Sequence, residues 1–194
     1  AYYLYKKACV VKIKAPKPTY NIKIILLGEP AVGKTSLIRR FVNGVFHESY
    51  QTTLGVDFLS KTITKEYIAK LQIWDVAGQI RFATFRKTFF GGARGAFLIF
   101  DITRKRSFDR LTEWVRDVKA FTRGAQCMLI ANKIDKEKRS VSKEAIQNFA
   151  QAINAVSVIE TSAKTGRGVE EAFEQLTEKI LIKDWDFESL KKNL

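Results

Sequence analysis

The sequence predicts an α/β domain with a six-stranded, mostly parallel sheet, one antiparallel edge strand and helices on both faces. Six apolar runs of strand length follow one another along the chain, and segments of helical periodicity separate most of them. Only the second and third runs are joined without a helix, which indicates one antiparallel hairpin. A chain of 194 residues with 46% hydrophobic composition is long and apolar enough for one sizeable core.

The first strand and the first helix enclose a glycine-rich loop. The run YNIKIILLG at 20–28 is rich in β-branched residues, and SLIRRFVNG at 36–44 repeats apolar residues at helical spacing. Between them the phosphate loop, GEPAVGKTS at 28–36, fits the pattern G-x-x-x-x-G-K-[ST]. A turn without a ligand is the alternative, but the order strand, loop, helix favours phosphate binding. Lys34 is expected to reach the β- and γ-phosphates, and the Thr35 hydroxyl to bind Mg²⁺ at the helix N-terminus.

The remaining elements are predicted in order. The strand candidates are 55–64, 67–75, 95–101, 126–132 and 155–161. Amphipathic helices are expected over 107–121 and 168–181, with helix starts at Ser107, Ser142 and Gly168. Ligands of such sheets bind beyond the carboxyl ends of the strands, where the phosphate loop lies.

Three segments are predicted along the chain: a basic N-terminal extension at 1–20, the nucleotide-binding domain at 21–182 and a C-terminal tail at 183–194 after the last helix. The formal net charge is +14, and 1–20 contains five lysines and no acid. We expect reversible contact of this extension with an anionic membrane, with a solvated basic face as the alternative.

The composition also bears on location. No apolar stretch is long enough to cross a bilayer, and the N-terminal residues lack a signal-peptide pattern. Cys9 and Cys127 share no metal-like spacing. We therefore expect a cytoplasmic protein that can associate peripherally with a membrane. No aromatic-basic RNA-binding signature or zinc pattern accompanies the charge, so nucleic acid is not expected as a partner.

The third strand ends in WDVAGQ, which suggests the reaction chemistry. The Asp75 carboxylate can face the phosphate loop and hold Mg²⁺ through a water, because magnesium gives up its hydration shell reluctantly. Gly78 lets its backbone N–H approach a γ-phosphate oxygen, and Gln79 can orient a water for in-line attack. A strand-ending Asp before a glycine turn is common, so the phosphate loop is what makes this motif informative.

Two further motifs, NKID and ETSAK, end the fifth and sixth strands and predict a base site. The Asp135 carboxylate can accept hydrogen bonds from N1–H and the 2-amino group of guanine, a pair of donors that adenine lacks. Asn132 can tie its loop to neighbouring segments, the Lys133 stem can lie along a base face, and the Ala163 N–H can meet guanine O6. The predicted specificity is for guanine.

With these motifs the chain resembles the Ras superfamily of small GTPases, and the Rab family most closely. The resemblance rests on GEPAVGKTS, TTLGVDF, KLQIWDVAGQIRF, LIFDIT, ANKID and ETSAK, and covers roughly residues 21 to 182. It implies the P-loop NTPase small G-domain fold, a GTP-bound on state, a GDP-bound off state and slow intrinsic hydrolysis. It also implies that Thr53 binds Mg²⁺ and senses the γ-phosphate, that Phe46 flanks guanine and that Tyr50 closes over the nucleotide.

The motifs and the resemblance together predict three sets of site residues. The catalytic set is Gln79, Lys34 and Thr53. The set that contacts GTP or GDP is Glu29, Pro30, Ala31, Val32, Gly33, Lys34, Thr35, Ser36, Phe46, Tyr50, Thr53, Gly78, Asn132, Lys133, Asp135, Ser162, Ala163 and Lys164. The Mg²⁺ set is Thr35, Thr53 and Asp75.

Several positions depart from the family pattern. Pro30 stands where the family usually has Gly or Ser, so one N–H donor is absent and a ring lies near the reacting phosphate, which predicts altered hydrolysis. Ile80 replaces a usual Glu and Gly91 a usual Arg, which predicts a changed fit to the regulators of ordinary Rabs. The residues LKKNL lack the cysteines that Rabs prenylate, so membrane contact is expected to use another route or residues beyond this chain.

The favoured function is a monomeric GTP-hydrolysing switch in membrane traffic or related signalling. Effectors are expected to bind switch I (46–60) and switch II (75–92), and an exchange factor and a GTPase-activating protein are expected as regulators. One alternative is a GTP-stabilised binding module with little hydrolysis, which Pro30 suggests. A less favoured alternative is a basic nucleic-acid-binding protein.

Overall fold

The structure is a computed structural model, and it describes residues 16–46, 55–77 and 88–192, with side chains as far as residue 184. The strands are β1 (Thr19–Leu27), β2 (Val56–Thr64), β3 (Ile68–Val76), β4 (Gly95–Asp101), β5 (Gln126–Asn132) and β6 (Ser157–Thr161). The helices are α1 (Lys34–Asn43), α3 (Lys105–Asp109), α4 (Leu111–Phe121), α5 (Lys143–Ala152) and α6 (Val169–Lys192).

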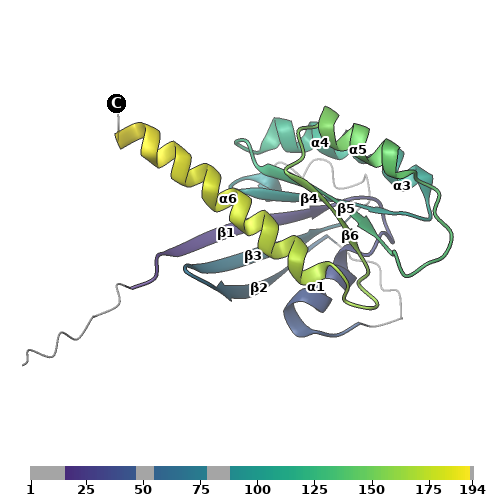
Figure 1. The fold of residues 1–194 in the computed structure, drawn as a ribbon, viewed down its shortest axis with the longest axis horizontal. Coiled ribbons are helices and arrows are strands. Elements are labelled where there is room, and N and C mark those ends of the chain that lie inside the picture. Colours follow the sequence, from purple (N-terminus) through teal and green to yellow (C-terminus); the bar gives the residue numbers. More distant parts are fainter. Residues whose placement is uncertain (1–15, 47–54, 78–87, 193–194) are drawn as a thin grey trace, which may run out of the picture.

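The six strands form one sheet in the order β2-β3-β1-β4-β5-β6 (Figure 1). Only the edge pair β2–β3 is antiparallel, and every other pair is parallel. The predicted sheet, including its antiparallel edge, is confirmed. The parallel register places Asp101 beside Asn132 and Asn132 beside Thr161. The polar residues that end β4, β5 and β6 therefore lie side by side at the carboxyl ends of these strands.

Helices cover both faces of the sheet, as predicted. Helices α1 and α6 lie on one face, and α3, α4 and α5 lie on the other (Figure 1). On the first face the rings of Phe41 and Phe173 stack with centroids 3.9 Å apart, and Phe97 meets Phe173 edge to face. All residues of β4 are buried, as expected for a central strand covered on both sides.

The helix predicted over 107–121 is divided into α3 and α4, which meet at Arg110, and the predicted start at Ser107 is wrong. Helix α3 begins earlier, at Lys105, because the Ser107 side chain makes hydrogen bonds to the turn that precedes the helix. Its hydroxyl accepts a hydrogen bond from the Asp101 N–H at 3.0 Å and donates to the Arg104 carbonyl at 2.7 Å. The start at Ser142 is confirmed, since its hydroxyl accepts from the Ala145 N–H.

The C-terminal segment differs from the predicted tail after the last helix. Helix α6 begins directly after Gly168, as predicted, but continues to Lys192. No Gly or Pro interrupts the sequence between these positions. Lys183 donates to the Gly124 carbonyl at 2.7 Å, which fastens the helix to the turn before β5. None of the helices in the described ranges combines the length and the apolar character that crossing a bilayer requires.

Candidate functional site

The phosphate loop joins β1 to α1, and two of its glycines are required by close packing. Gly28 has a φ of 147°, and a Cβ there would lie 2.1 Å from the Ile99 carbonyl oxygen. Gly33 has a φ of 101°, and a Cβ there would lie 2.3 Å from the Asn132 side-chain nitrogen. Any larger side chain would push the loop away from β4 and β5. Helix α1 begins at Lys34, so Lys34 and Thr35 lie in its first turn as predicted.

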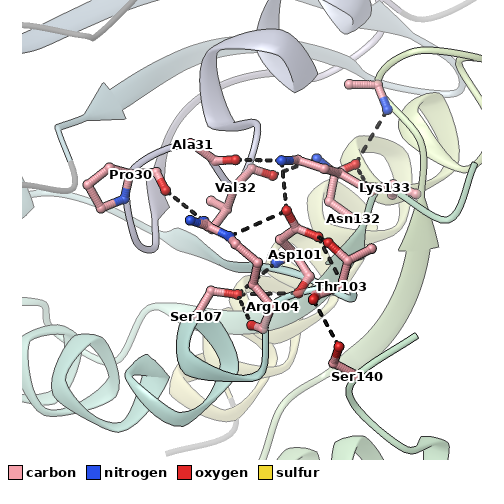
Figure 2. Close-up of polar contacts among 12 residues, drawn as sticks. Pro30, Ala31, Val32, Asp101, Thr103, Arg104, Ser107, Asn132, Lys133 and Ser140 are labelled. Atoms are coloured by element: carbon pink, nitrogen blue, oxygen red, sulfur yellow. Dashed lines mark hydrogen bonds and ion pairs between the residues drawn. The ribbon is translucent and has the colours of Figure 1, made fainter. Parts of the chain in front are cut away.

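Three successive carbonyls of the phosphate loop accept hydrogen bonds from side chains at or directly after the carboxyl ends of β4 and β5 (Figure 2). The pairs are Arg104 with Pro30 at 2.8 Å, Lys133 with Ala31 at 2.6 Å and Asn132 with Val32 at 2.8 Å. These donors hold the carbonyl side of the loop. An anion-binding loop uses its backbone N–H groups, so this arrangement suits a phosphate on the opposite side of the backbone.

Asp101, at the end of β4, organises two of these donors (Figure 2). Its carboxylate is 4% exposed and lies 2.7 Å from the Lys133 ammonium and 3.5 Å from Nε of Arg104. The Thr103 N–H and hydroxyl donate to its other oxygen at 2.9 and 2.7 Å. Burial alone would raise the pKa of Asp101, but the bonds from Lys133 and Thr103 lower this pKa below its ordinary value of 3.8. The carboxylate is therefore ionised at neutral pH.

Lys34 lies inside the phosphate loop. Its ammonium donates to the carbonyls of Gly28 at 2.8 Å and Glu29 at 3.1 Å, and the residue is only 6% exposed. Burial lowers the pKa of Lys34 from 10.5 to about 8, although the nearby carboxylates of Asp75 and Glu29 oppose this shift. A phosphate group in the loop would favour the charged form, because it adds negative charge beside the ammonium.

Thr35 and Asp75 supply oxygen atoms suited to magnesium. The Thr35 hydroxyl donates to the carboxylate of Asp75, which is the penultimate residue of β3 and is 2% exposed. This contact confirms that Asp75 faces the phosphate loop. In the described ranges no group of three or more His, Cys, Asp or Glu side chains could hold a metal. Hydroxyl and carboxylate oxygens fit Mg²⁺, which typically binds one or two protein ligands together with phosphate oxygens and water.

The NKID and ETSAK motifs come together at the ends of β5 and β6. Asn132, which is buried, accepts a hydrogen bond from the Thr161 hydroxyl at 3.0 Å, and the Ala163 N–H lies 3.4 Å from the same oxygen. The Ser162 hydroxyl donates to the exposed Asp135 carboxylate at 2.6 Å. Asn132 therefore ties the two motifs together, as its position in the sequence predicted.

Comparison with known proteins agrees with this arrangement. The sequence model of the Ras family matches residues 23–182. The chain belongs to the Ras family. It is 41% identical to Ras-related protein Rab-18 of Lymnaea stagnalis over 177 residues, which is 90% of this chain and 87% of that protein. It is 44% identical to Rab-1 of Theileria parva over 158 residues (79% and 71%) and 42% identical to human Rab-15 over 162 residues (82% and 76%).

These relatives identify a Rab-like small GTPase, a protein that binds guanine nucleotide. Not every predicted site residue of this GTPase can be placed. Tyr50, Thr53, Gly78, Gln79 and Ile80 lie outside the described residues.

The structure also describes four other residues that are predicted to contact the nucleotide. Phe46 is partly buried against the hydrophobic core below α1 and α6. Ser36 is half-buried on α1, and Lys164 is exposed. The Glu29 carboxylate lies 3.4 Å from the guanidinium of Arg110.

The sequence interpretation assigned no role to Asp101 or Arg104 of this Rab-like GTPase. A usable signal was present, because Asp101 lies at the carboxyl end of a strand, as Asp75 does. The rule that polar residues at the carboxyl ends of parallel strands form sites applies equally to both. Arg104 carried no such signal, since an exposed arginine after a strand is ordinary.

Three aromatic side chains form a partly exposed surface: Phe58 of β2, Trp74 of β3 and Phe89, which belongs to the described part of switch II. Phe58 is 61% exposed and stacks on Trp74 with centroids 5.6 Å apart, and Phe89 lies 6.1 Å from Trp74. The Lys23 ammonium lies over the Trp74 ring and donates to the carbonyl of Gly91, the position where the family usually has arginine. We call Phe58, Trp74 and Phe89 the aromatic surface.

Proposed function

We propose that this protein is a GTP-hydrolysing switch that cycles between a GTP-bound, effector-binding form and a GDP-bound form, in membrane traffic or related signalling. The observation that carries the proposal is the direct linkage of the base motif to the phosphate loop. Asn132 and Lys133 both donate to carbonyls of that loop. A nucleoside triphosphate carries its base at one end and its phosphate chain at the other. A connected unit that contacts both ends can therefore bind the whole nucleotide.

The base specificity follows from Asp135. Its carboxylate, oriented by Ser162 at 2.6 Å, can accept from both N1–H and the 2-amino group of guanine. Adenine offers no such pair of donors at this edge, so the carboxylate would lose both partners. The predicted contacts of Phe46, Ala163 and Lys164 with the nucleotide are part of this proposal.

The hydrolytic machinery is proposed from Lys34, Gln79 and the Mg²⁺ ligands. Thr35, Thr53 and Asp75, the last through a water, would hold Mg²⁺, which when bound neutralises charge on the phosphate oxygens. Lys34 provides an ammonium inside the phosphate loop, and Gln79 orients the attacking water. Electrostatic stabilisation by such preorganised groups is the main contribution expected for phosphoryl transfer.

The switch itself is proposed to be an order–disorder change controlled by the γ-phosphate. Thr53 and Gly78 gain contacts only when that group is present, and hydrolysis releases both segments. Effectors would bind 46–60 and 75–92, and the aromatic surface suits a partner with an apolar contact face. An exchange factor and a GTPase-activating protein would act on the same segments.

Single-turnover hydrolysis tests this function. The wild-type protein loaded with GTP should release phosphate slowly, and Gln79→Leu should release it more slowly while binding GTP with nearly unchanged affinity. The reason is that Gln79 acts on the attacking water in the transition state and contributes little to ground-state binding. Equal rates in both proteins would instead support the GTP-stabilised binding module.

The basic N-terminal extension is proposed to give reversible contact with anionic membranes. Each of its lysines can gain about 1 kcal/mol near an anionic leaflet, an attraction that salt screens. Cosedimentation with phosphatidylserine vesicles should therefore be strong at low salt, weak at high salt and absent after deletion of residues 1–17, which removes all five lysines and leaves β1 intact. Binding that is indifferent to salt or to the deletion would leave the extension as a solvated basic face.

A further inference from the structure

Arg40, on the last turn of α1, uses all three guanidinium nitrogens to bind backbone carbonyls. Nε donates to the Ala163 carbonyl at 2.9 Å and Nη2 to the Lys164 carbonyl at 2.6 Å. Nη1 donates to the Gly44 carbonyl at 2.7 Å. One side chain thus connects the part of the ETSAK motif that follows β6 with Gly44, the residue that caps the C-terminus of α1.

Gly44 is held by Arg40 from two directions. Its N–H donates to the Arg40 carbonyl at 3.0 Å, while its own carbonyl accepts from the Arg40 side chain. Gly44 adopts a left-handed conformation with a φ of 70°, which turns the chain out of the helix toward Phe46. Phe46 is the residue predicted to flank the base, so Arg40 sets the start of the segment that carries it.

The contacts with the ETSAK motif also set the direction of peptide planes. In a trans peptide the C=O and N–H groups point in opposite directions. Fixing the Ala163 carbonyl therefore fixes the Lys164 N–H, which lies in the same peptide plane. The Ala163 N–H that is predicted to meet guanine O6 lies in the preceding peptide plane, so Arg40 acts on it through the shared Cα of Ala163. Asp135, the acceptor for the other guanine edge atoms, has a separate support in Ser162.

We propose that Arg40 is a positioning residue for guanine recognition, which holds the O6-facing backbone and the start of switch I as one unit. The inference rests on the proposed guanine site. Arginine suits this role because its planar fork presents several donors in fixed directions and stays charged at all relevant pH values. A lysine offers one nitrogen and cannot reach three carbonyls in the same geometry.

Competition binding with three triphosphates tests the proposal. GTP carries O6, N1–H and the 2-amino group. Inosine triphosphate lacks only the 2-amino group, and 6-thioguanosine triphosphate keeps both donors but replaces O6 with sulfur, a weaker acceptor. In Arg40→Ala the preference for GTP over 6-thioguanosine triphosphate should fall by roughly tenfold, the order expected for a misplaced hydrogen-bond donor. The preference for GTP over inosine triphosphate, which reports on Asp135, should be unchanged.

Two further variants keep the result interpretable. Arg40→Lys retains the charge and should show the same change to a smaller extent, even if Arg40→Ala folds poorly. Arg39→Ala removes the neighbouring arginine of α1 and should leave both preferences unchanged. Equal loss of affinity for all three nucleotides in the Arg40 variants would show a merely structural role and overturn the proposal. A wild-type protein without preference for GTP would instead overturn the guanine site on which it rests.

Discussion

Asp101 holds Lys133 in place across two neighbouring strands. The carboxylate oxygen and the ammonium nitrogen lie 2.7 Å apart at the ends of β4 and β5, and the same ammonium donates to the Ala31 carbonyl. The lysine of the base motif is thus fixed between a buried carboxylate and the phosphate loop. In the proposed nucleotide site Asp101 would act through Lys133, and we therefore regard it as a positioning residue.

Asp101→Asn should accelerate nucleotide dissociation. The amide keeps the shape of the side chain but removes the charge that holds Lys133, and a hydrogen bond to a charged group contributes about 1.5–3 kcal/mol. We expect the dissociation rate of labelled GDP to rise by roughly ten- to a hundredfold. Asp109→Asn is the matched control, because Asp109 is exposed and pairs only with Lys105 on the same helix among the described contacts. Equal rates in the two variants would remove Asp101 from the site.

The same residue predicts a pH dependence of stability. The folded-state pKa of Asp101 is below its ordinary value of 3.8, so its ionisation stabilises the fold above about pH 4. This contribution is lost as the pH falls through the lowered folded-state pKa, because the unfolded chain binds the proton first. Urea unfolding of GDP-bound protein should show a stability difference between wild type and Asp101→Asn at pH 6 that shrinks progressively below pH 4. A constant difference across this range would contradict the assignment.

Asp135→Asn should exchange the preference for guanine for a preference for xanthine. The amide offers a donor where the 2-oxo group of xanthine has an acceptor, whereas guanine presents a donor at the same place. Competition of GTP with xanthosine triphosphate measures the change. An unaltered preference for GTP would show that Asp135 does not read the base.

Pro30→Gly should change the rate of hydrolysis. Proline removes one N–H from the phosphate loop, and its ring occupies space where the family usually has a smaller residue. If the ring hinders the reacting geometry, the glycine variant releases phosphate faster in a single turnover. Arg104 binds the Pro30 carbonyl, which glycine also possesses, so this contact is retained in the variant. An equal or slower rate would exclude hindrance by Pro30.

Phe173→Ala should destabilise the domain strongly. Phe173 is fully buried, stacks on Phe41 and meets Phe97, and removal of such a ring typically costs about 3–5 kcal/mol. Phe58→Ala is the control, since this ring is 61% exposed and should cost well under half as much. Chemical denaturation of the GDP-bound proteins compares the two. A similar loss in both variants would contradict the packing described for α1 and α6.

The order of elements and the main binding motifs were accessible from sequence because they depend on short-range patterns. Apolar periodicity identified the six strands, and the spacing from Gly28 to Thr35 identified a loop whose function requires that spacing. The union of NKID with ETSAK followed from the parallel sheet, since strands of one direction end at one edge. Asn132 contacts the neighbouring motif and the phosphate loop, as this reasoning required.

Contacts that depend on the exact packing of distant segments required the tertiary structure. Arg104 reaches Pro30 and Arg40 reaches Ala163 only because loops and helices far apart in sequence meet in three dimensions. The start of α3 before Ser107 depends on the hydrogen bond between the Ser107 hydroxyl and the Asp101 N–H of β4. Helix propensity alone does not predict such a bond. The sequence by itself determined the family, the sheet and the chemical types of the site residues, because each depends on the order and spacing of residues along the chain. Only the tertiary structure decided which side chains position the site residues. The reason is that the roles of Arg40, Arg104 and Asp101 depend on the groups that folding brings next to them.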